Sequence, residues 1–180
     1  MPSGIGGFPP KVEVFYFADD GVIPNNPTLP LLVYRGVLRD RTDRAEAFEV
    51  AFRRNGWTGS WRNGIFPFPH FHSTAHEVLG IAEGDVTVQL GGANGRTFTL
   101  HPGDAVVIPA GVGHQKHGCE GELVVIGAYP DGHDVDLCRA VRDEHDRAVA
   151  NVARVTLPGT DPLFGRDGPL AEHWPGRPTS

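Results

Sequence analysis

Two histidines one residue apart, with a carboxylate five positions after the second, place the strongest constraint on the fold of this chain. They are His70, His72 and Glu77, within the stretch GIFPFPHFHSTAHEVLGIAEG at residues 64–84. Alternate side chains of a β-strand share a face, so the two imidazoles would lie roughly 6.6 Å apart along one strand. A short turn and the apolar run Val78 to Ala82 would return Glu77 on a neighbouring strand. The spacing predicts a metal site built on β-strands.

A second segment, GDAVVIPAGVGHQKH at residues 103–117, supplies a third imidazole. The turn at residues 109–111 ends the apolar run Ala105 to Ile108, because proline offers no ladder donor and glycine accepts turn dihedrals. His114 then begins the next strand. We therefore expect a separate hairpin to bring His114 to the other three side chains.

The two segments resemble the paired motifs of the cupin superfamily. The first motif is matched throughout, at Gly64, His70, His72, Glu77 and Gly84. The second is matched at Gly103, Pro109, Gly111 and His114. Gly118 stands where that second motif has an asparagine, a departure that leaves the ligand set intact. The motifs span residues 64–118, a little under a third of the chain.

A looser likeness extends over more of the sequence. The segments PNNPTLPLLVYRG, HSTAHE and DPLFGRDGPL, at residues 24–36, 72–77 and 161–170, resemble the small, uncharacterised YjlB-type cupins of bacteria. The resemblance implies an all-β fold, the double-stranded β-helix or cupin jelly-roll barrel, with two flanking helices. It also implies that the metal ligands are His70, His72, Glu77 and His114.

The length of 180 residues predicts a single cupin domain. Residues 1–60 would supply N-terminal strands and a helix that cover the barrel, and residues 61–130 the cupin core with both motifs. Residues 131–180 would form a C-terminal helix and an irregular tail, packed along the barrel up to about Trp174.

Helical signals occur on both sides of the core. Asp43 and Glu46 form a capping-box pattern, and Gly56 suits a helix C-cap, so the sequence predicts a helix over residues 43–55. Residues 135–152 carry a second apolar stripe at helical spacing, at Cys138, Val141, Ala148 and Val152.

Strand signals surround the motifs. We expect strands at residues 11–17, 31–37 and 122–128, and a hairpin of residues 85–90 and 96–100 around the turn GGANG. The continuous apolar runs 106–108 and 123–126 predict burial on both faces. This burial, with the family likeness, favours a homodimer that packs one sheet against its partner. The aromatic residues before His70 are expected in the core rather than at the barrel mouth: Trp57, Trp61, Phe66 and Phe68.

Composition bears on the class of partner. The formal net charge is −6 without a basic cluster, which disfavours a nucleic-acid or acidic-membrane partner and favours a small molecule. No run of 18 apolar residues occurs, so no membrane span is expected. Cys119 and Cys138 make no disulfide framework and the N-terminus has no signal-peptide pattern, which together favour the cytoplasm.

Three histidines and a glutamate also limit the metal. They would fill the tetrahedral shell of zinc, but they leave two positions open on octahedral Fe, Mn, Ni or Co, which we therefore expect. The first hypothesis is a metalloenzyme of the dioxygenase or isomerase type that acts on a small polar substrate. The second is a non-catalytic barrel that binds a sugar or small molecule, in which the metal organises the pocket. A third is a structural zinc site.

Two further residues lie close to the proposed ligands. His76 precedes Glu77 and faces the opposite side of the strand, so the five-residue offset favours Glu77 as the ligand. Lys116 shares the face of His114, where it either pairs with an anionic substrate or extends to solvent. The other histidines have no spacing partner and are expected at the surface or in turns: His101, His117, His133, His145 and His173.

Overall fold

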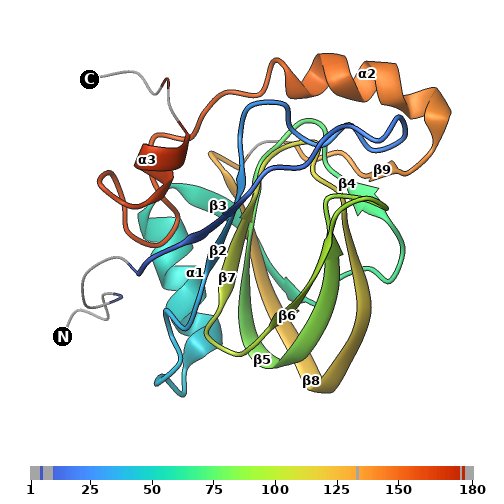
Figure 1. Cartoon of the computed structure of the whole chain (residues 1–180). Helices are drawn as coiled ribbons and strands as arrows, with labels where there is room; N and C mark the ends of the chain where they lie inside the picture. The colour runs from blue at the N-terminus through green and yellow to red at the C-terminus, as the bar shows by residue number, and fades with distance from the viewer. Residues whose placement is uncertain (1–4, 6–9, 133, 175, 177–180) are drawn as a thin grey trace.

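Antiparallel strands that curl into a barrel form the centre of the structure, a computed structural model that describes residues 5, 10–132, 134–174 and 176. The strands are β1 (Glu13–Phe15), β2 (Leu31–Tyr34), β3 (Trp57–Asn63), β4 (His70–Phe71), β5 (Glu77–Leu90), β6 (Arg96–Leu100), β7 (Ala105–Ile108), β8 (His114–Pro130) and β9 (Cys138–Arg139). The helices are α1 (Arg44–Arg54), α2 (Arg142–Val152) and α3 (Leu170–His173). Figure 1 shows α1 and α3 along one side of the barrel and α2 across one end. The predicted β-barrel with flanking helices is confirmed.

All strand pairs are antiparallel, and β5 with β8 is the longest of them. The main order is β1-β2-β7-β5-β8-β4-β9, with β3 added to β8 and β6 added to β5. The β5–β8 ladder runs from Val78 opposite Ala128 to Leu90 opposite His114. These two strands also pair with most of the others, β5 with β6 and β7, and β8 with β3 and β4.

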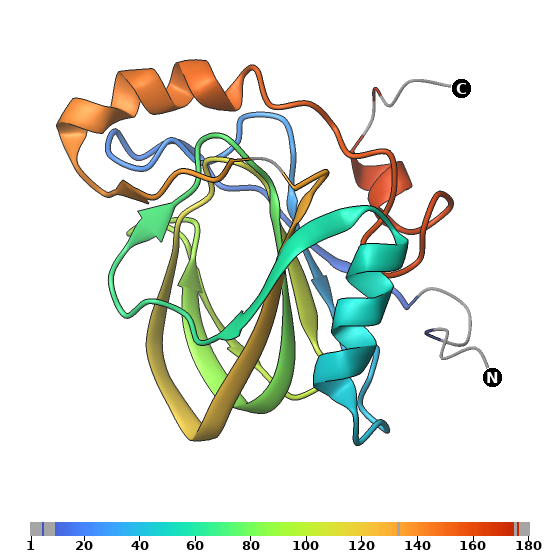
Figure 2. The same ribbon diagram turned by 180° about the vertical axis from the view of Figure 1, so that it is seen from behind.

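The β5–β8 ribbon is bent in its middle. Its register shifts on both sides of Glu83, and such bulges bend and twist a ladder. Gly84 follows with φ 77°, and a Cβ there would lie 2.6 Å from the carbonyl oxygen of Glu122, so the bend requires glycine. Figures 1 and 2 show the ribbon folding back, so that both of its ends lie at the same end of the barrel. Gly84, the last residue of the first motif, is thus a bending point.

Two apolar cores occupy opposite faces of the same strands. The interior core fills the barrel and includes Leu31, Val33, Leu79, Ile81, Val86, Val88, Leu90, Val106 and Val125. The outer core lies beneath α1 and the C-terminal tail and includes Phe48, Phe52, Val78, Val107, Ile126, Leu170 and Trp174. Neighbours on one strand, such as Val106 and Val107, therefore belong to different cores.

The predicted burial on both faces is confirmed for residues 106–108, which are at most 2% exposed. In the second run Val125 and Ile126 are fully buried, whereas Leu123 and Val124 are partly exposed. The outer faces of both runs are covered by the chain's own helix and tail, so this burial has an intramolecular cause. The homodimer stays a prediction.

The helix α1 forms where the sequence predicts it, but without the predicted capping box. The Asp43 carboxylate accepts a hydrogen bond from Arg41 at 2.7 Å and makes no cap bond to the helix. The predicted C-cap is confirmed, since Gly56 follows the helix with φ 77°. Phe48 and Phe52 are fully buried, so packing rather than capping stabilises this helix.

The predicted stripe over residues 135–152 is wrong in its first half. Cys138 lies on β9, opposite Phe71 of β4, and Val141 is 45% exposed. The edge of β4 offers unpaired backbone groups, and Cys138 and Arg139 pair with them as the short strand β9. The helix α2 begins only at Arg142. The tail packs up to Trp174 as expected, and its indole N–H donates to the Pro30 carbonyl at 2.9 Å.

Two findings bear on the composition arguments. Cys119 is exposed and Cys138 is buried, and both are free thiols. Among the described residues, the longest helices have 11 residues, too short to cross a bilayer.

Gly80 sets how closely α1 approaches the sheet, and this closeness is testable. A Cβ on Gly80 would lie 2.6–2.7 Å from ring atoms of Phe48. We expect Gly80→Ala to lower the free energy of unfolding by about 1–3 kcal/mol through overpacking, measured by urea denaturation. Gly118→Ala is the control, because a Cβ there meets nothing within 4 Å. Equal stability of the two variants would contradict close packing at Gly80.

Candidate metal centre

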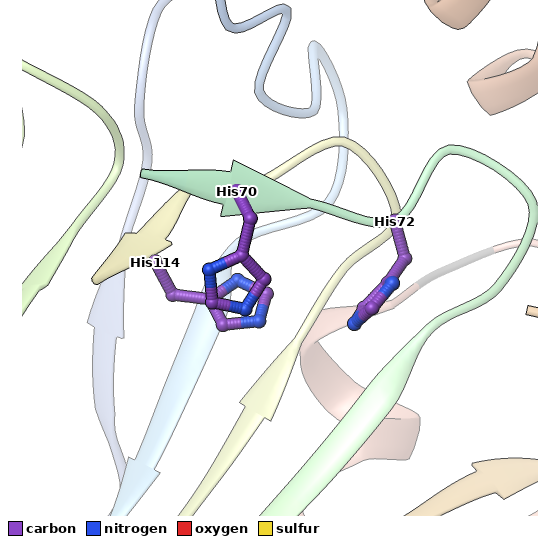
Figure 3. Close-up of side chains that lie close together, drawn as sticks. All are labelled: His70, His72 and His114. Atoms are coloured by element: carbon purple, nitrogen blue, oxygen red, sulfur yellow. The ribbon is translucent and has the colours of Figure 1, made fainter. Parts of the chain in front are cut away.

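The imidazoles of His70, His72 and His114 converge at one end of the barrel. His70 lies on β4 directly opposite His114 at the start of β8, and His72 follows just beyond the end of β4. One ring nitrogen from each lies within 4.8 Å of the others. Figure 3 shows the rings of His70 and His114 side by side, with His72 approaching from the far end of β4. The sequence prediction that these three histidines meet is confirmed.

Each of these rings is oriented by a backbone carbonyl. The Nδ1 atom of His70 lies 3.0 Å from the Phe68 oxygen and that of His114 lies 3.1 Å from the Val112 oxygen. The Nδ1 atom of His72 contacts the carbonyl oxygen of Asp136. A carbonyl oxygen only accepts, so each Nδ1 must donate, which leaves Nε2 as the nitrogen available for coordination. Metal-binding histidines usually have this arrangement.

Glu77, at the start of β5, brings its carboxylate to the same point. Its Oε2 atom lies 3.2 Å from the Nε2 atoms of both His72 and His114. This oxygen is buried and makes no hydrogen bond with any described residue. Because Nδ1 already carries the ring proton, each Nε2 can face the carboxylate favourably only with a second proton or a cation between them. The donor set therefore fits a bound cation.

Burial and mutual charge set the protonation of the cluster. Burial lowers the pKa of His70 to about 3, and the neighbouring His114 adds to the effect. Burial also opposes a charged His72, but the Glu77 carboxylate outweighs it and raises the pKa of that ring. Burial favours the neutral acid of Glu77, yet His72 and His114 bring its pKa below the usual range. At neutral pH the cluster thus offers an uncharged His70 and an ionised Glu77.

His76 points away from this cluster, as its neighbouring position to Glu77 predicts. It is 1% exposed, and its ring packs against the indole of Trp174 with centroids 4.7 Å apart. Its Nδ1 atom accepts a hydrogen bond from the backbone N–H of Ala110 at 2.9 Å. His76 therefore joins the tail to the barrel on the opposite face of the strand.

The turn after His72 is held by Asp136, which sequence reasoning missed. The Asp136 carboxylate accepts hydrogen bonds from the backbone N–H groups of Ser73 and Thr74 at 2.7 and 3.2 Å, and from both hydroxyl groups. Asn151 of α2 donates to the Ser73 hydroxyl at 3.0 Å. Asp136 thus fixes the turn with its side chain and the His72 ring with its backbone carbonyl. No spacing signal in the sequence links residues so far apart.

A cavity of about 350 Å³ adjoins the four side chains. Besides them, it is lined by Trp61, Asn63, Gly64, Ile65, Phe66, Pro67, Leu79, Lys116 and Tyr129. Lys116, the candidate pocket residue, therefore does line the cavity.

The expectation that the aromatic residues before His70 are all in the core is wrong. Trp57 is a core residue at 1% exposure, but Phe66 is 48% exposed, and Phe66 and Trp61 line the cavity. Phe66 stacks on Phe68 with ring centroids 4.8 Å apart, and both pack edge-on against His70. The loop between β3 and β4 runs beside the start of β8, where the backbone N–H of Lys116 donates to the Phe66 carbonyl at 2.9 Å, and its rings form a wall at the mouth.

Tyr129 is the functional candidate that sequence reasoning missed. Its hydroxyl oxygen accepts a hydrogen bond from the indole N–H of Trp61 at 2.9 Å. Burial, together with the Glu77 carboxylate, raises the pKa of Tyr129 to about 12. The sequence could have identified Tyr129, because it lies four positions after Val125 of the interior core. Side chains at even spacing on a strand share a face, so both point into the barrel.

The remaining histidines lie outside this site. His101 and His117 are exposed, and His101 contacts Asp85 at 2.9 Å. His145 and His173 are partly buried, and His145 pairs with Asp19 at 2.8 Å between α2 and the N-terminal segment. His133 lies outside the described residues.

The curled antiparallel barrel with histidines converging at one end defines a cupin. A family model described as Cupin domain matches residues 62–126. The chain is also 41% identical over 164 residues to the Uncharacterized protein YjlB of Bacillus subtilis (strain 168), covering 91% of this chain and 97% of that protein. The chain therefore belongs to the YjlB-type cupin family.

Solved structures with a similar barrel are larger proteins. Oxalate decarboxylase of Bacillus subtilis, which has Mn(II) centres, matches with a TM-score of 0.38 and 18% identity over 63% of this chain and 28% of its own. Procruciferin, an 11S globulin from Brassica napus, matches with a TM-score of 0.38 and 18% identity over 54% of this chain and 27% of its own. This chain spans less than a third of either protein's length.

The role of Asp136 gives a prediction about stability. Asp136→Ala leaves the donors of Ser73 and Thr74 without their acceptor, so the free energy of unfolding at pH 7 should fall by about 1–3 kcal/mol. Burial opposes the charged form, but the Ser73, Cys138 and Thr74 donors outweigh it and lower the pKa of Asp136 below 3.8. Its contribution is therefore present above 3.8 and lost as pH falls through the lower pKa of the folded state.

Urea unfolding of chelator-treated protein from pH 7 down to about pH 3 measures this effect. The gap between wild type and Asp136→Ala should shrink in acid. Asp134→Ala is the control, because it removes an exposed carboxylate and keeps the backbone carbonyl that accepts from Thr74. Equal losses in the two variants, or a gap that widens in acid, would contradict the assigned role.

Proposed function

We propose that the protein is a metal-dependent enzyme of the dioxygenase or isomerase type that acts on a small polar substrate. His70, His72, Glu77 and His114 would hold the divalent ion. The observation that carries this proposal is the buried Oε2 atom of Glu77, 3.2 Å from two Nε2 atoms and without a hydrogen bond among the described residues. Lone pairs facing one another in a buried site repel, and a cation between them turns that repulsion into attraction.

The donor set also bears on the identity of the ion. Imidazole and carboxylate donors suit Fe, Mn, Ni or Co, whose octahedral shell exceeds the four protein ligands by two positions. When bound, such an ion supplies Lewis-acid or redox chemistry to a substrate in the cavity.

The residues around the ligands support an enzyme over a non-catalytic sugar-binding or small-molecule-binding barrel. Tyr129 lines the cavity, where its hydroxyl oxygen accepts a hydrogen bond from Trp61 and the hydroxyl group also interacts with the Glu77 carboxylate. With its pKa raised to about 12 by burial and by Glu77, it stays protonated at neutral pH and can donate to a substrate atom. Lys116 adds a cationic group to the same cavity. A purely binding barrel does not need a proton donor such as Tyr129.

The ligand assignment predicts which variants lose metal. His72→Ala, His114→Ala and Glu77→Gln should lose stoichiometric metal, because each leaves an incomplete shell. His76→Ala should retain it, since His76 faces Trp174 on the other side of the strand. Elemental analysis of protein purified without chelators, with circular dichroism to check folding, measures this. Metal loss in folded His76→Ala alone would overturn the assignment of Glu77.

The two further coordination positions give a second prediction. The Co(II)-substituted protein should show a weak six-coordinate visible spectrum, and lactate or pyruvate should change it by replacing water on the ion. Binding of the ion should weaken as pH falls through the raised pKa of His72, because protons compete with the ion for that imidazole, whereas His70 stays uncharged until its pKa of about 3. An intense four-coordinate spectrum that ignores both acids would contradict the enzyme proposal and favour a structural metal.

A further inference from the structure

Lys116 directs its side chain into the barrel. It lies on β8 directly opposite Val88 of β5, and Val88 belongs to the interior core. Residues directly opposite in an antiparallel pair share a face, so Lys116 also points inward, and it lines the cavity beside the candidate metal centre. Lysine is rare here, since the sequence has only Lys11 and Lys116. Among the described residues lining the cavity, no other is a lysine or arginine.

No described carboxylate neutralises Lys116. Ion pairs between arginine and carboxylate occur elsewhere in the described chain, at Arg35, Arg41 and Arg62. The carboxylate inside the cavity, that of Glu77, contacts His72 and His114 instead. The sequence has a net charge of −6 and so has acidic residues in excess, yet none of the described ones forms an ion pair with this ammonium group. Lys116 is partly exposed where it lines the cavity, so its unpaired ammonium group is open to a ligand that brings its own negative charge.

The rest of the cavity defines the other part of that ligand. Trp61, Ile65, Phe66 and Leu79 give it apolar walls. Its volume of about 350 Å³ is at the small end of ligand-binding sites. A phosphate group would call for several cationic or backbone donors, whereas a single lysine suits one carboxylate.

We propose that the substrate is a small organic acid with an apolar body, whose carboxylate pairs with Lys116. This inference rests on the proposed function for the second contact, in which an oxygen substituent of the acid reaches the metal centre. The apolar body lies against the walls formed by Trp61, Phe66 and Leu79. Lys116 is then the residue that selects acids over neutral analogues.

Titration calorimetry of the Mn(II)-loaded protein with three probes tests the proposal. The probes are 3-phenyllactate, its neutral amide and lactate. We expect 3-phenyllactate to bind about tenfold more tightly than either, because only it has both the charge and the apolar body. Lys116→Met should lower the affinity for 3-phenyllactate about tenfold. The affinity for the amide and the metal content should not change. Lys116→Arg should retain most of the preference, and Lys11→Met is the matched control.

Several outcomes would overturn the proposal. They are equal affinity for the acid and the amide, unchanged acid binding in Lys116→Met, and no binding of 3-phenyllactate to protein that carries stoichiometric metal. Failure of the proposed function gives a different result. In that case the wild-type protein takes up no metal or holds the ion in a closed four-coordinate shell, while acid binding that depends on Lys116 would still support the charge selection.

Discussion

The pairing of β5 with β8 is the interaction on which the rest of the structure depends. The ladder joins Val78 to Ala128 at one end and Leu90 to His114 at the other. A straight ribbon of this length would keep Glu77 and His114 far apart, because they begin strands that run in opposite directions. The bend at Gly84 brings both ends to one end of the barrel, where the two side chains lie 3.2 Å apart. The same bend gives the strands two faces to bury, one inside the barrel and one beneath α1.

Orientation of the histidines depends on backbone carbonyls that come from three different segments. Phe68 precedes β4, Val112 precedes β8, and Asp136 precedes β9. Each carbonyl accepts from a ring nitrogen and so fixes which nitrogen faces the cavity. The arrangement of the site is therefore set largely by main-chain groups, whose positions follow from the fold rather than from side-chain identity.

The sequence predicted the parts of the structure that depend on local spacing. The meeting of the three histidines, the opposite orientation of His76 and the helix that carries Phe48 follow from strand alternation, turn signals and helical spacing. The barrel itself was implied by the resemblance to the cupin motifs. One error is local, because Asp43 pairs with Arg41, two positions before it, instead of capping α1. Other errors occur where a distant partner decides the outcome. Cys138 joins β9 because the edge of β4 lies beside it. The support that Asp136 gives to His72 could not be predicted either, because no periodicity connects residues 64 positions apart.

The bent ribbon also has a consequence for how the chain reaches its native state. Val78 must find a partner fifty positions away before β5 and β8 can form their ladder. Such non-local contacts carry a high loop-closure cost and slow the folding of β-barrels to roughly milliseconds or longer. Glu77 and His114 approach each other only when the whole ribbon has formed and bent. The nascent chain therefore presents only the neighbouring His70 and His72 and separate further ligands during synthesis, and the four-ligand cluster exists only once the ribbon has formed and bent.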